Sequence, residues 1–407
     1  MQELGHGQTI FRRPMAHVDM NAFFASCHQV ADPARYGGKP VAVAGDPAER
    51  RGIILTASYQ ARARGVFTGM TVGKALGLCP EMLLIPPDRR LYQAYSQKIW
   101  EILDRFSPAV EPFSIDEAWV DLTGCPGGDP VTVAGEIQQT IRLELGLPCS
   151  VGLSANKLLA KMASEMEKPE GLTVLHPEAV AEVLWPMPTG KLFGVGARTA
   201  AALARMGILT IGDLARTPPE SLVKRLGKLG RQMIERANGR DGSPVRSGGE
   251  GPKSVGQSLT LPRNLQDLEE MGTVLAELGA RVARRLRAVG MAGKTVTVTF
   301  RTPDFKTFSR AVTLPEATQL ESEIHREALR VLVEKWPAGK AVRLLGVSVS
   351  GLKKSSETFR QSTFWDSPAQ TERALALSRT LDHLDAKFGE GAVRRGTSLT
   401  RSFHQVK

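Results

Sequence analysis

The feature that most constrains this chain is a pair of adjacent acids inside an apolar stretch. Residues 113–122 read Phe-Ser-Ile-Asp-Glu-Ala-Trp-Val-Asp-Leu, the pattern of a half-buried strand pair or hairpin that Asp116 and Glu117 interrupt. Neighbouring strand residues point to opposite faces, so both acids serve one site only where the strand bends or ends. A charge in apolar surroundings must be paired, solvated or bound to a metal. The stretch therefore predicts either a solvated hairpin tip or a functional carboxylate site.

A second acid of this kind lies near the start of the chain. Residues 16–25 read Ala-His-Val-Asp-Met-Asn-Ala-Phe-Phe-Ala, which predicts a short buried strand ended by Asp19 and a helix that begins near Ala22. Mg²⁺ prefers oxygen ligands and combines few protein carboxylates with substrate phosphates. Two such ions, about 3.5–4 Å apart, activate an attacking hydroxyl and neutralise the leaving oxygens of a phosphoryl displacement. Asp19, Asp116 and Glu117 are therefore candidates for a two-metal site.

These two stretches resemble the metal motifs of the Y-family translesion DNA polymerases, and most of all the bacterial DNA polymerase IV type. Residues 19–24 (Asp-Met-Asn-Ala-Phe-Phe) match one motif and residues 114–118 (Ser-Ile-Asp-Glu-Ala) match the other. The resemblance extends over residues 14–357. It implies a template-directed DNA polymerase that adds dNTPs to a primer 3′-hydroxyl with two Mg²⁺ ions, at low fidelity and without proofreading.

The composition indicates what kind of molecule this chain binds and in which cellular compartment it lies. A chain of 407 residues suits several domains, since one domain usually takes about 100–200 residues. The formal charge of +11 favours a polyanionic partner, and on charge alone a membrane surface would serve as well as nucleic acid. Four cysteines without Cys-x-x-Cys spacing indicate a reducing cytosol. No signal peptide and no run of about 20 apolar residues is visible, so we expect a cytoplasmic protein.

The resemblance implies an α+β, multidomain fold of the right-hand polymerase type. The Gly/Pro/Ser-rich composition of the segment near residue 245 predicts a flexible linker between domains. The expected parts are a catalytic palm (12–21 and 88–177), small fingers (22–87), a helical thumb with a helix-hairpin-helix motif (178–242), a linker (243–252), an α/β little finger that binds DNA (253–357) and a C-terminal tail (358–407).

Hydrophobic periodicity predicts the main elements without help from the resemblance. Strands are expected at 41–44, 52–56, 149–154, 254–261, 295–300, 306–314 and 342–349, and helices at 91–103, 131–145, 156–163, 265–289, 318–335 and 371–388.

The resemblance also assigns roles in the active site. Asp19, Asp116 and the backbone carbonyl of Met20 would hold the metal that arrives with the nucleotide. Asp19, Asp116 and Glu117 would hold the metal that activates the primer hydroxyl. Asn21 stands where many relatives have an acid, and it is not among the expected ligands.

Nucleotide contacts are expected from the fingers and the palm. Tyr59 and Arg62 lie three residues apart on one helix face, and the arginine fork suits phosphate oxygens. Without the family, a half-buried ring and a surface ion-pair partner would be the simpler interpretation. In the family, Lys161 reaches the triphosphate and Phe24 is the steric gate that excludes a ribose 2′-hydroxyl. The remaining members of the expected nucleotide site are Phe23, which also suits an ordinary core position, and Thr56.

DNA contacts are expected in three places. Gly194 and Gly196 allow a tight loop whose amides open onto a helix N-terminus, a sequence-independent phosphate site, although an ordinary helix connection fits as well. The other two are Lys253 with Ser254 at the start of the little finger, and a basic stripe of Arg281, Arg284, Arg285 and Arg287.

The tail contains a peptide, residues 361–365, that resembles the motif by which bacterial polymerases dock on the sliding clamp. Gln361 would fill a polar subsite, and Phe364 and Trp365 would be the buried anchors. The peptide departs from the commoner Leu-Phe ending, and two aromatics that cap the little finger are the alternative. The expected partners are primer–template DNA, dNTPs and the replicative clamp, with the chain as a monomer.

Two other functions remain open on the sequence. A non-catalytic adaptor that binds DNA and the clamp would be expected to lack one of the three carboxylates, and none is missing. A nucleotide cyclase on a similar metal-binding palm would explain the acids, but not the glycine hairpin, the linker or the basic C-terminal part.

Overall fold

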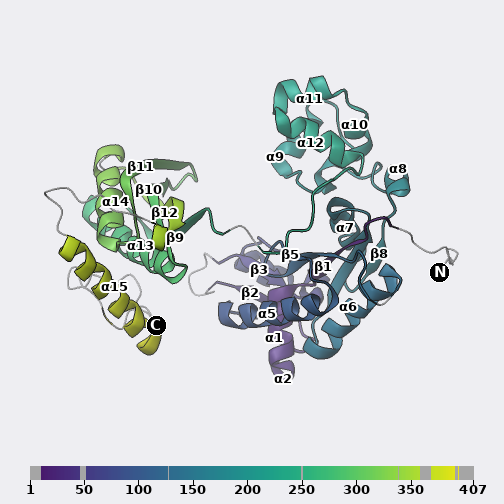
Figure 1. Cartoon of the computed structure of the whole chain (residues 1–407), viewed down its shortest axis with the longest axis horizontal. Coiled ribbons are helices and arrows are strands. Elements are labelled where there is room, and N and C mark those ends of the chain that lie inside the picture. Colours follow the sequence, from purple (N-terminus) through teal and green to yellow (C-terminus); the bar gives the residue numbers. More distant parts are fainter. Residues whose placement is uncertain are drawn as a thin grey trace. The chain divides into compact units, whose positions relative to one another are not determined.

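The computed structural model describes residues 11–45, 52–126, 128–248, 251–337, 339–357, 368–389 and 393, with side chains in the last helix from residue 372 onward. The chain divides into two compact units, Met1–Gly249 and Glu250–Lys407, and each is considered by itself (Figure 1). Both units combine helices with antiparallel or mixed sheets. Among the described residues no helix is both long and apolar enough to span a bilayer.

The first unit is built around a five-stranded sheet with the order β5-β6-β1-β7-β8. Its central strand, β1 (Met15–Met20), is buried along its whole length and pairs antiparallel with β6 (Glu117–Asp121) and β7 (Cys149–Ser154). The outer strands are β5 (Val110–Pro112) and β8 (Leu172–Val174). The apolar run at 113–122 is therefore a hairpin, as predicted, with residues 113–116 in the turn between β5 and β6.

Helices complete the core of this sheet. α5 (Arg89–Phe106) and α6 (Pro130–Leu145) place one apolar side each in the core that the strands line, and α1 (Phe23–Ala31) adds Phe23 and Cys27. α7 (Lys157–Ser164) packs on β7 so closely that a Cβ at Gly152 would lie 2.1 Å from the Ala160 carbonyl oxygen. Because Gly152 has no side chain, α7 lies directly against the backbone of the sheet.

A smaller sheet, with the order β3-β2-β4, follows α1 and α2 (Pro33–Tyr36). It consists of β2 (Val41–Ala44), β3 (Ile54–Ala57) and β4 (Leu83–Ile85), together with α3 (Tyr59–Arg62) and α4 (Val72–Leu78). The strand predicted at 52–56 begins two residues later, because Ile53 makes an isolated bridge to Thr71 instead. Small apolar residues fill the core of this part.

The helical end of the first unit has a core of its own, which Leu158 and Leu159 of α7 share. Its helices are α8 (Val180–Val183), α9 (Ala197–Ala204), α10 (Ile211–Arg216), α11 (Pro219–Leu226) and α12 (Lys228–Ala237), with 3-10 turns at Pro177–Ala179 and Thr189–Lys191. A capping box between Thr210 and Asp213 starts α10.

The segment expected to be a free linker is bound to the first unit in its first part. The Glu111 carboxylate accepts hydrogen bonds from the Arg246 backbone N–H and from Lys157 Nζ, both at 2.7 Å. Ser247 Oγ donates to the Pro108 carbonyl at 3.0 Å. Composition indicated flexibility here, but a backbone N–H bound to a carboxylate is a strong contact that composition does not reveal.

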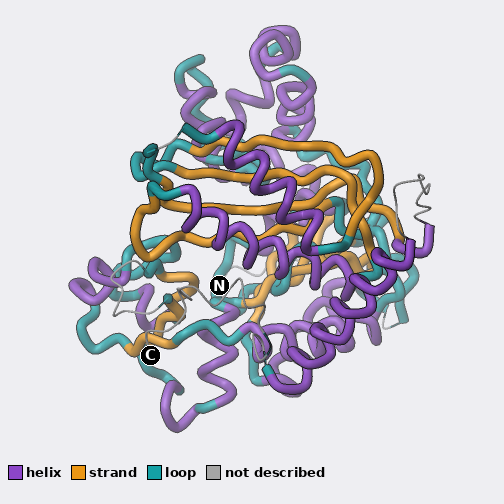
Figure 2. Tube along the Cα trace, turned by 90° about the vertical axis from the view of Figure 1, so that its left-hand side faces the viewer, coloured by secondary structure: helices purple, strands orange, loops and turns teal. Residues whose placement is uncertain are grey.

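The second unit is a four-stranded antiparallel sheet with the order β11-β10-β12-β9. Its strands are β9 (Ser254–Leu265), β10 (Met291–Arg301), β11 (Thr307–Thr318) and β12 (Val342–Lys354). Figure 2 shows the helices α13 (Leu268–Ala288) and α14 (Glu321–Lys335) lying across one face of this sheet. The alternating pattern predicted the strands and the two helices correctly.

The opposite face of this sheet, here called the helix-free face, carries small side chains. Val296, Val298, Val347 and Val349 point into the core, so their neighbours along each strand point away from the helices. The strand register places those neighbours side by side: Ser254, Gly256, Ser258, Thr260, Thr295, Thr297, Thr299, Gly346, Ser348 and Ser350. The middle of this face is therefore uncharged and rich in hydroxyl groups, and the same register places Arg301 and Leu344 at its edge.

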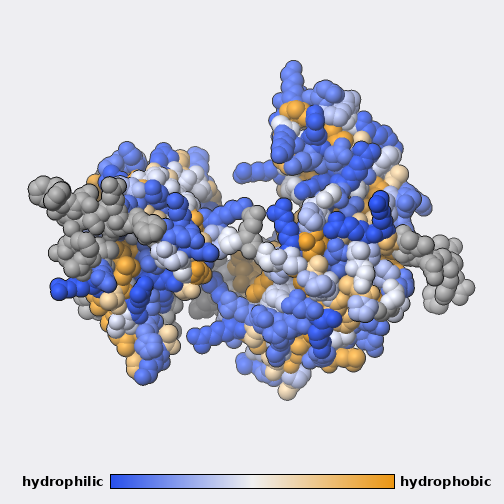
Figure 3. All heavy atoms as spheres, viewed as in Figure 1, coloured by the Kyte–Doolittle hydropathy of each residue, from blue (hydrophilic) through white to orange (hydrophobic). Residues whose placement is uncertain are grey.

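The last helix, α15 (Pro368–Phe388), was also predicted, and it changes the interpretation of the basic stripe. Arg287 binds both oxygens of Asp382, at 2.6 and 2.7 Å, and Arg284 binds Asp385 at 2.8 Å. Two arginines expected to contact DNA are thus paired within the second unit. On the face drawn in Figure 3, hydrophilic residues cover most of the surface of both units.

Candidate active site

The strand pairing brings the predicted acids together. Asp19 near the end of β1 lies opposite Glu117 at the start of β6, and the Met20 N–H donates to the Asp116 carbonyl at 3.0 Å. Asp116 is the last residue of the turn that precedes β6. The bend between turn and strand explains how two adjacent acids serve one site. The solvated hairpin tip is thereby excluded for Glu117, which is only half-buried but faces Asp19.

The three carboxylates influence one another. Burial raises the pKa of Asp116, and the nearby charges of Asp19 and Glu117 raise it further, although the Ser114 hydroxyl at 2.5 Å acts in the opposite direction. Burial also opposes ionisation of Glu117, but His17 and Lys161 more than offset it and lower its pKa. A cluster of acids with this mutual repulsion requires positive charge close by.

Two lysines supply that charge in this structure. Lys161 Nζ contacts Asp19 Oδ2 at 3.0 Å and also binds Glu117. Lys168 Nζ contacts Asp19 Oδ1 at 2.8 Å. Glu165 bridges the two ammonium groups, at 2.9 and 3.1 Å. Both oxygens of Asp19 therefore bind cationic groups, which shows that the carboxylates are placed to hold positive charge between them.

The donor set fits a hard divalent ion. Asp19, Asp116 and Glu117 offer carboxylate oxygens, the ligand type that Mg²⁺ prefers. The lysine ammonium groups stand in for cationic charge on the same atoms that would bind a metal. Lys161 was expected at the triphosphate, and here it lies between two of the acids instead.

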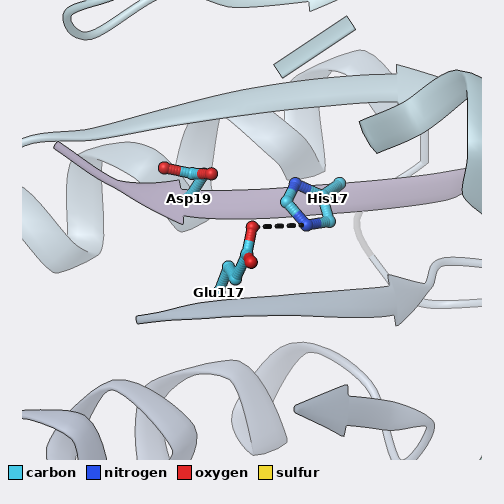
Figure 4. A group of neighbouring side chains, drawn as sticks. All are labelled: His17, Asp19 and Glu117. Atoms are coloured by element: carbon cyan, nitrogen blue, oxygen red, sulfur yellow. Dashed lines mark ion pairs between the residues drawn. The ribbon is translucent and has the colours of Figure 1, made fainter. Parts of the chain in front are cut away.

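His17 is the member of the site that the sequence interpretation missed. It lies two residues before Asp19 on the same strand face, fully buried, and its Nε2 is 3.4 Å from Glu117 Oε2 (Figure 4). Its Nδ1 is 2.8 Å from Ser164 Oγ. Burial lowers the pKa of the ring, which is consequently neutral near pH 7. The i, i+2 spacing in a strand was the signal that could have found it.

Lys168, Glu165 and the surroundings of Asn21 were also not predicted. Asn21 is buried and binds Ser150 Oγ at 3.1 Å and the Glu170 backbone N–H at 2.8 Å. Its amide thus links β1 to the neighbouring strand and to the turn after α7.

Phe23 and Phe24 separate into two environments. Ala22 has a left-handed backbone, with φ +48°, where the chain turns from β1 into α1. Phe23 then enters the core at 2% exposure, as the ordinary interpretation predicted. Phe24 is half-buried and stacks on Tyr92, with ring centroids 4.2 Å apart. Tyr92 is in turn held by His28 at 2.9 Å, so Phe24 rests on a fixed surface.

The fingers side chains lie on a short helix that Ser58 caps. The Arg62 guanidinium lies over the Tyr59 ring at 4.9 Å, and its Nε donates to the Ala57 carbonyl at 2.9 Å. Among the described residues the buried Tyr59 hydroxyl has no hydrogen-bond partner. Burial raises the pKa of Tyr59, and the nearby charge of Arg62 acts in the opposite direction. Thr56 Oγ1 donates to the neighbouring Leu55 carbonyl.

The residues expected to contact DNA lie in three different segments of the chain. Gly194 has φ +91°, and a Cβ there would meet Arg236 Nη1 at 2.3 Å, so this tight loop requires glycine. Gly196 is the N-cap of α9 and leaves the first amides of that helix without a side-chain cap. Ser254 begins β9 on the helix-free face and Lys253 precedes it. Gln361, Phe364 and Trp365 lie outside the described residues.

Comparison with known proteins agrees with this geometry. Residues 18–165 match the impB/mucB/samB family and residues 252–364 match the C-terminal domain of that family. A protein named DNA polymerase IV from Moorella thermoacetica is 47% identical, over 94% of this chain and 95% of that protein. DNA polymerase IV 1 of Bacillus subtilis is 38% identical, over 97% of this chain and 95% of that protein.

A solved structure of a Y-family DNA polymerase chimera of Dbh and Dpo4 is also similar. It superimposes with a TM-score of 0.75 at 27% sequence identity and covers 83% of this chain and 98% of that one. The adaptor and cyclase interpretations find no such support. The chain belongs to the impB/mucB/samB family and is a Y-family, DNA-directed DNA polymerase of the translesion, DNA polymerase IV type.

Proposed function

We propose that this polymerase performs nucleotidyl transfer at Asp19, Asp116 and Glu117 with two Mg²⁺ ions. The observation that supports this best is the pairing of Asp19 with Glu117 across β1 and β6, beside the hydrogen bond between Met20 and Asp116. Asp19, Asp116 and the Met20 carbonyl would hold the nucleotide's ion, and Asp19, Asp116 and Glu117 the other. The ions would lower the pKa of the primer 3′-hydroxyl and neutralise charge on the leaving pyrophosphate.

The protein's own groups position the incoming nucleotide. Tyr59 and Arg62 on α3 and Lys161 on α7 would bind the triphosphate, and Thr56 and Phe23 would lie beside the nucleotide. Lys161 therefore exchanges partners, since in this structure its ammonium binds Asp19 and Glu117. Phe24, fixed by Tyr92, would lie against the sugar and exclude a 2′-hydroxyl.

DNA would be held through its backbone at the glycine loop of residues 194 and 196, at Lys253 with Ser254, and on the helix-free face. Small hydroxyl side chains let a flat sheet approach the duplex closely and bind phosphates without reading sequence. The palm, fingers, thumb, linker and little finger keep their expected boundaries in this proposal. A cytoplasmic monomer of low fidelity, which docks on the sliding clamp through residues 361–365, completes it.

Primer extension by the Asp116→Ala variant tests the site. We expect the extension rate to fall by about a thousandfold, because a metal clamp provides several kcal/mol of transition-state stabilisation. Binding of primer–template DNA, followed by fluorescence anisotropy without Mg²⁺, should stay within about twofold. Ser114→Ala is the matched control, since it removes only the hydroxyl beside Asp116. Extension by Asp116→Ala at the parent rate would refute the assignment.

A further inference from the structure

Two side chains approach the same oxygen of Glu117. Lys161 Nζ binds Oε2, and His17 Nε2 lies 3.4 Å from that oxygen. The two differ in mobility. Lys161 has a long flexible stem on α7, whereas His17 belongs to the central strand and is fully buried. When Lys161 turns to the triphosphate, His17 remains beside Oε2.

The ring of His17 is fixed on every side. Its backbone pairs with Trp119 on one neighbouring strand and with Gly152 on the other. The Trp119 ring packs edge-on against it, with centroids 5.3 Å apart and an interplanar angle of 62°. On its far side, Nδ1 lies 2.8 Å from Ser164 Oγ. The ring consequently points Nε2 at Glu117 without freedom to turn elsewhere.

Counting protons selects one arrangement of hydrogen bonds. A neutral imidazole carries a single N–H. With the proton on Nδ1, the ring would donate to Ser164, and the lone pair of Nε2 would face the Glu117 carboxylate, which places two acceptors together. With the proton on Nε2, the ring donates toward Glu117, and Nδ1 accepts from the Ser164 hydroxyl. His17 Nε2 makes no hydrogen bond among the described residues, and Glu117 Oε2 at 3.4 Å is the acceptor that it faces. Only the second arrangement directs an N–H at that acceptor while Nδ1 accepts from Ser164, and a ring buried this deeply needs a partner for each nitrogen.

The Ser164 hydroxyl has a second acceptor within reach. Ser164 Oγ lies 2.9 Å from the Lys161 carbonyl, one turn earlier on α7. One hydroxyl proton cannot serve both the carbonyl and the imidazole. The acceptor to which the Ser164 hydroxyl donates therefore links the ring that faces Glu117 to the helix that carries Lys161.

We propose that His17 is a positioning residue, in which Ser164 donates to Nδ1 and the Nε2 proton holds Oε2 of Glu117. The contact is long while Lys161 occupies the same oxygen, and it shortens when Lys161 leaves. Glu117 then keeps Oε1 directed at the metal site through the reaction. Histidine commonly orients a neighbouring carboxylate in this way, and loss of such a supporting contact typically reduces metal affinity or activity about 10–100-fold. The proposal rests on the role of Glu117 as a metal ligand.

The tautomer can be observed directly. In long-range ¹H–¹⁵N spectra of the full-length, ¹⁵N-histidine-labelled protein without metal, His17 should be neutral with its proton on Nε2. The His17→Gln variant assigns the signal. In Lys161→Met, the Nε2 proton should move downfield as its bond to Glu117 shortens. A proton on Nδ1, or no response to Lys161→Met, would overturn the proposal, and neither result depends on catalysis.

Metal dependence gives the second measurement. His17→Phe should raise the Mg²⁺ concentration for half-maximal primer extension by about tenfold and weaken Mn²⁺ binding, measured by electron paramagnetic resonance, by a similar factor. The KM for dNTP should change less than twofold. His17→Gln, which keeps an N–H near the Nε2 position, should recover most of both losses. If His17→Phe and His17→Gln had the same Mg²⁺ requirement and the same Mn²⁺ affinity, His17 would be only a packing residue.

Ser164→Ala tests the same hydrogen bonds with a smaller change, in case the variants of the buried His17 fail to fold. It leaves the ring and Glu117 in place and removes the hydroxyl that lies between Nδ1 and the Lys161 carbonyl. We expect a mixture of tautomers and a Mg²⁺ requirement raised about threefold, a part of the effect of losing the whole contact. A single Nε2–H tautomer with parent metal dependence would contradict the proposed chain of hydrogen bonds. If Asp116→Ala remained active, the proposed two-metal site would be wrong. The spectra would still test the hydrogen bonds of His17, because they do not depend on the metal site.

Discussion

The sheets of the two units carry opposite kinds of side chain. The five-stranded sheet places Asp19 and Glu117 on adjacent strands and surrounds them with His17, Lys161 and Lys168. The helix-free face of the second sheet carries hydroxyl groups and glycines along three strands. The first arrangement concentrates charge at fixed separations, as phosphoryl transfer requires. The second offers a surface of small hydroxyl side chains, which suits a partner whose sequence is not read.

Pairing with cations and hydrogen-bond donors explains why the first sheet tolerates its buried charges. Each carboxylate has a cation or a hydrogen-bond donor in contact, and Lys161 comes from a helix that lies against the sheet backbone, with Lys168 in the turn that follows it. On the helix-free face of the second sheet, the paired residues 254–260, 295–299 and 346–350 are uncharged, and Arg301 lies at the end of β10. Four predictions test this contrast, from the largest effect to the smallest.

Sugar selection should depend on the first unit alone. Phe24→Ala removes the ring that stacks on Tyr92 and opens space beside the nucleotide. We expect discrimination against ribonucleotides, measured as the ratio of kcat/KM values for dNTP and rNTP, to fall by about a hundredfold. Phe23→Leu is the control, since Phe23 is in the core and its loss should affect stability rather than selection. Unchanged discrimination in Phe24→Ala would remove the gate assignment.

Acidification should affect catalysis before it affects DNA binding. The pKa of Asp116 is raised, so this carboxylate takes up its proton at a higher pH than an ordinary aspartate as the pH falls. A protonated carboxyl does not bind a metal, and the extension rate should fall about tenfold per pH unit below that pKa. Excess Mg²⁺ should move the fall to lower pH. A pH profile that is identical at low and high Mg²⁺ would contradict this explanation.

A charge on the helix-free face should weaken DNA binding without changing sequence preference. Thr297→Glu places a carboxylate at the centre of that face, on β10 between β11 and β12. We expect about a fivefold loss of affinity at low salt that shrinks as salt is added. Thr297→Gln has nearly the same size without the charge and should bind like the parent. Equal affinities of the two variants for DNA would show that the duplex lies elsewhere.

The ion pairs of α15 should contribute a small and local stability. Arg287→Lys keeps the charge but loses the two-point contact with Asp382. We expect about 1 kcal/mol less protection of the α15 amides in hydrogen exchange, because one charge-assisted hydrogen bond is lost. Arg330→Lys, whose ion-pair partner Glu327 lies in its own helix, should leave α15 unchanged. Primer extension should not respond to either variant.

Much of the fold followed from local patterns. Alternation along 295–300 and the apolar stripe of 91–103 predicted β10 and α5, because each pattern matches one period of regular structure. Asp19, Asp116 and Glu117 were identified as a set by motif; the strand register pairs Asp19 with Glu117, and the Met20 N–H binds the Asp116 carbonyl beside them. The nucleotide, DNA and clamp contacts stay predictions.

What the sequence could not supply depended on contacts between distant residues. The pairing of Lys168 with Asp19 joins positions 149 residues apart, and no local pattern encodes it. The same is true of Glu111, which binds the backbone of Arg246 across 135 residues. His17 was closer to detection, since it shares a strand face with Asp19. Its partner Ser164, however, comes from a helix far along the chain.

The left-handed corner at Ala22 has a consequence for protein engineering. This single residue sets the angle between the strand that ends in the metal-binding acid and the helix that carries Phe24. A branched side chain there would resist the backbone angle and tilt the helix. Attempts to broaden the sugar repertoire by altering this corner would therefore disturb ion binding as well, whereas changes at Phe24 itself leave the corner intact.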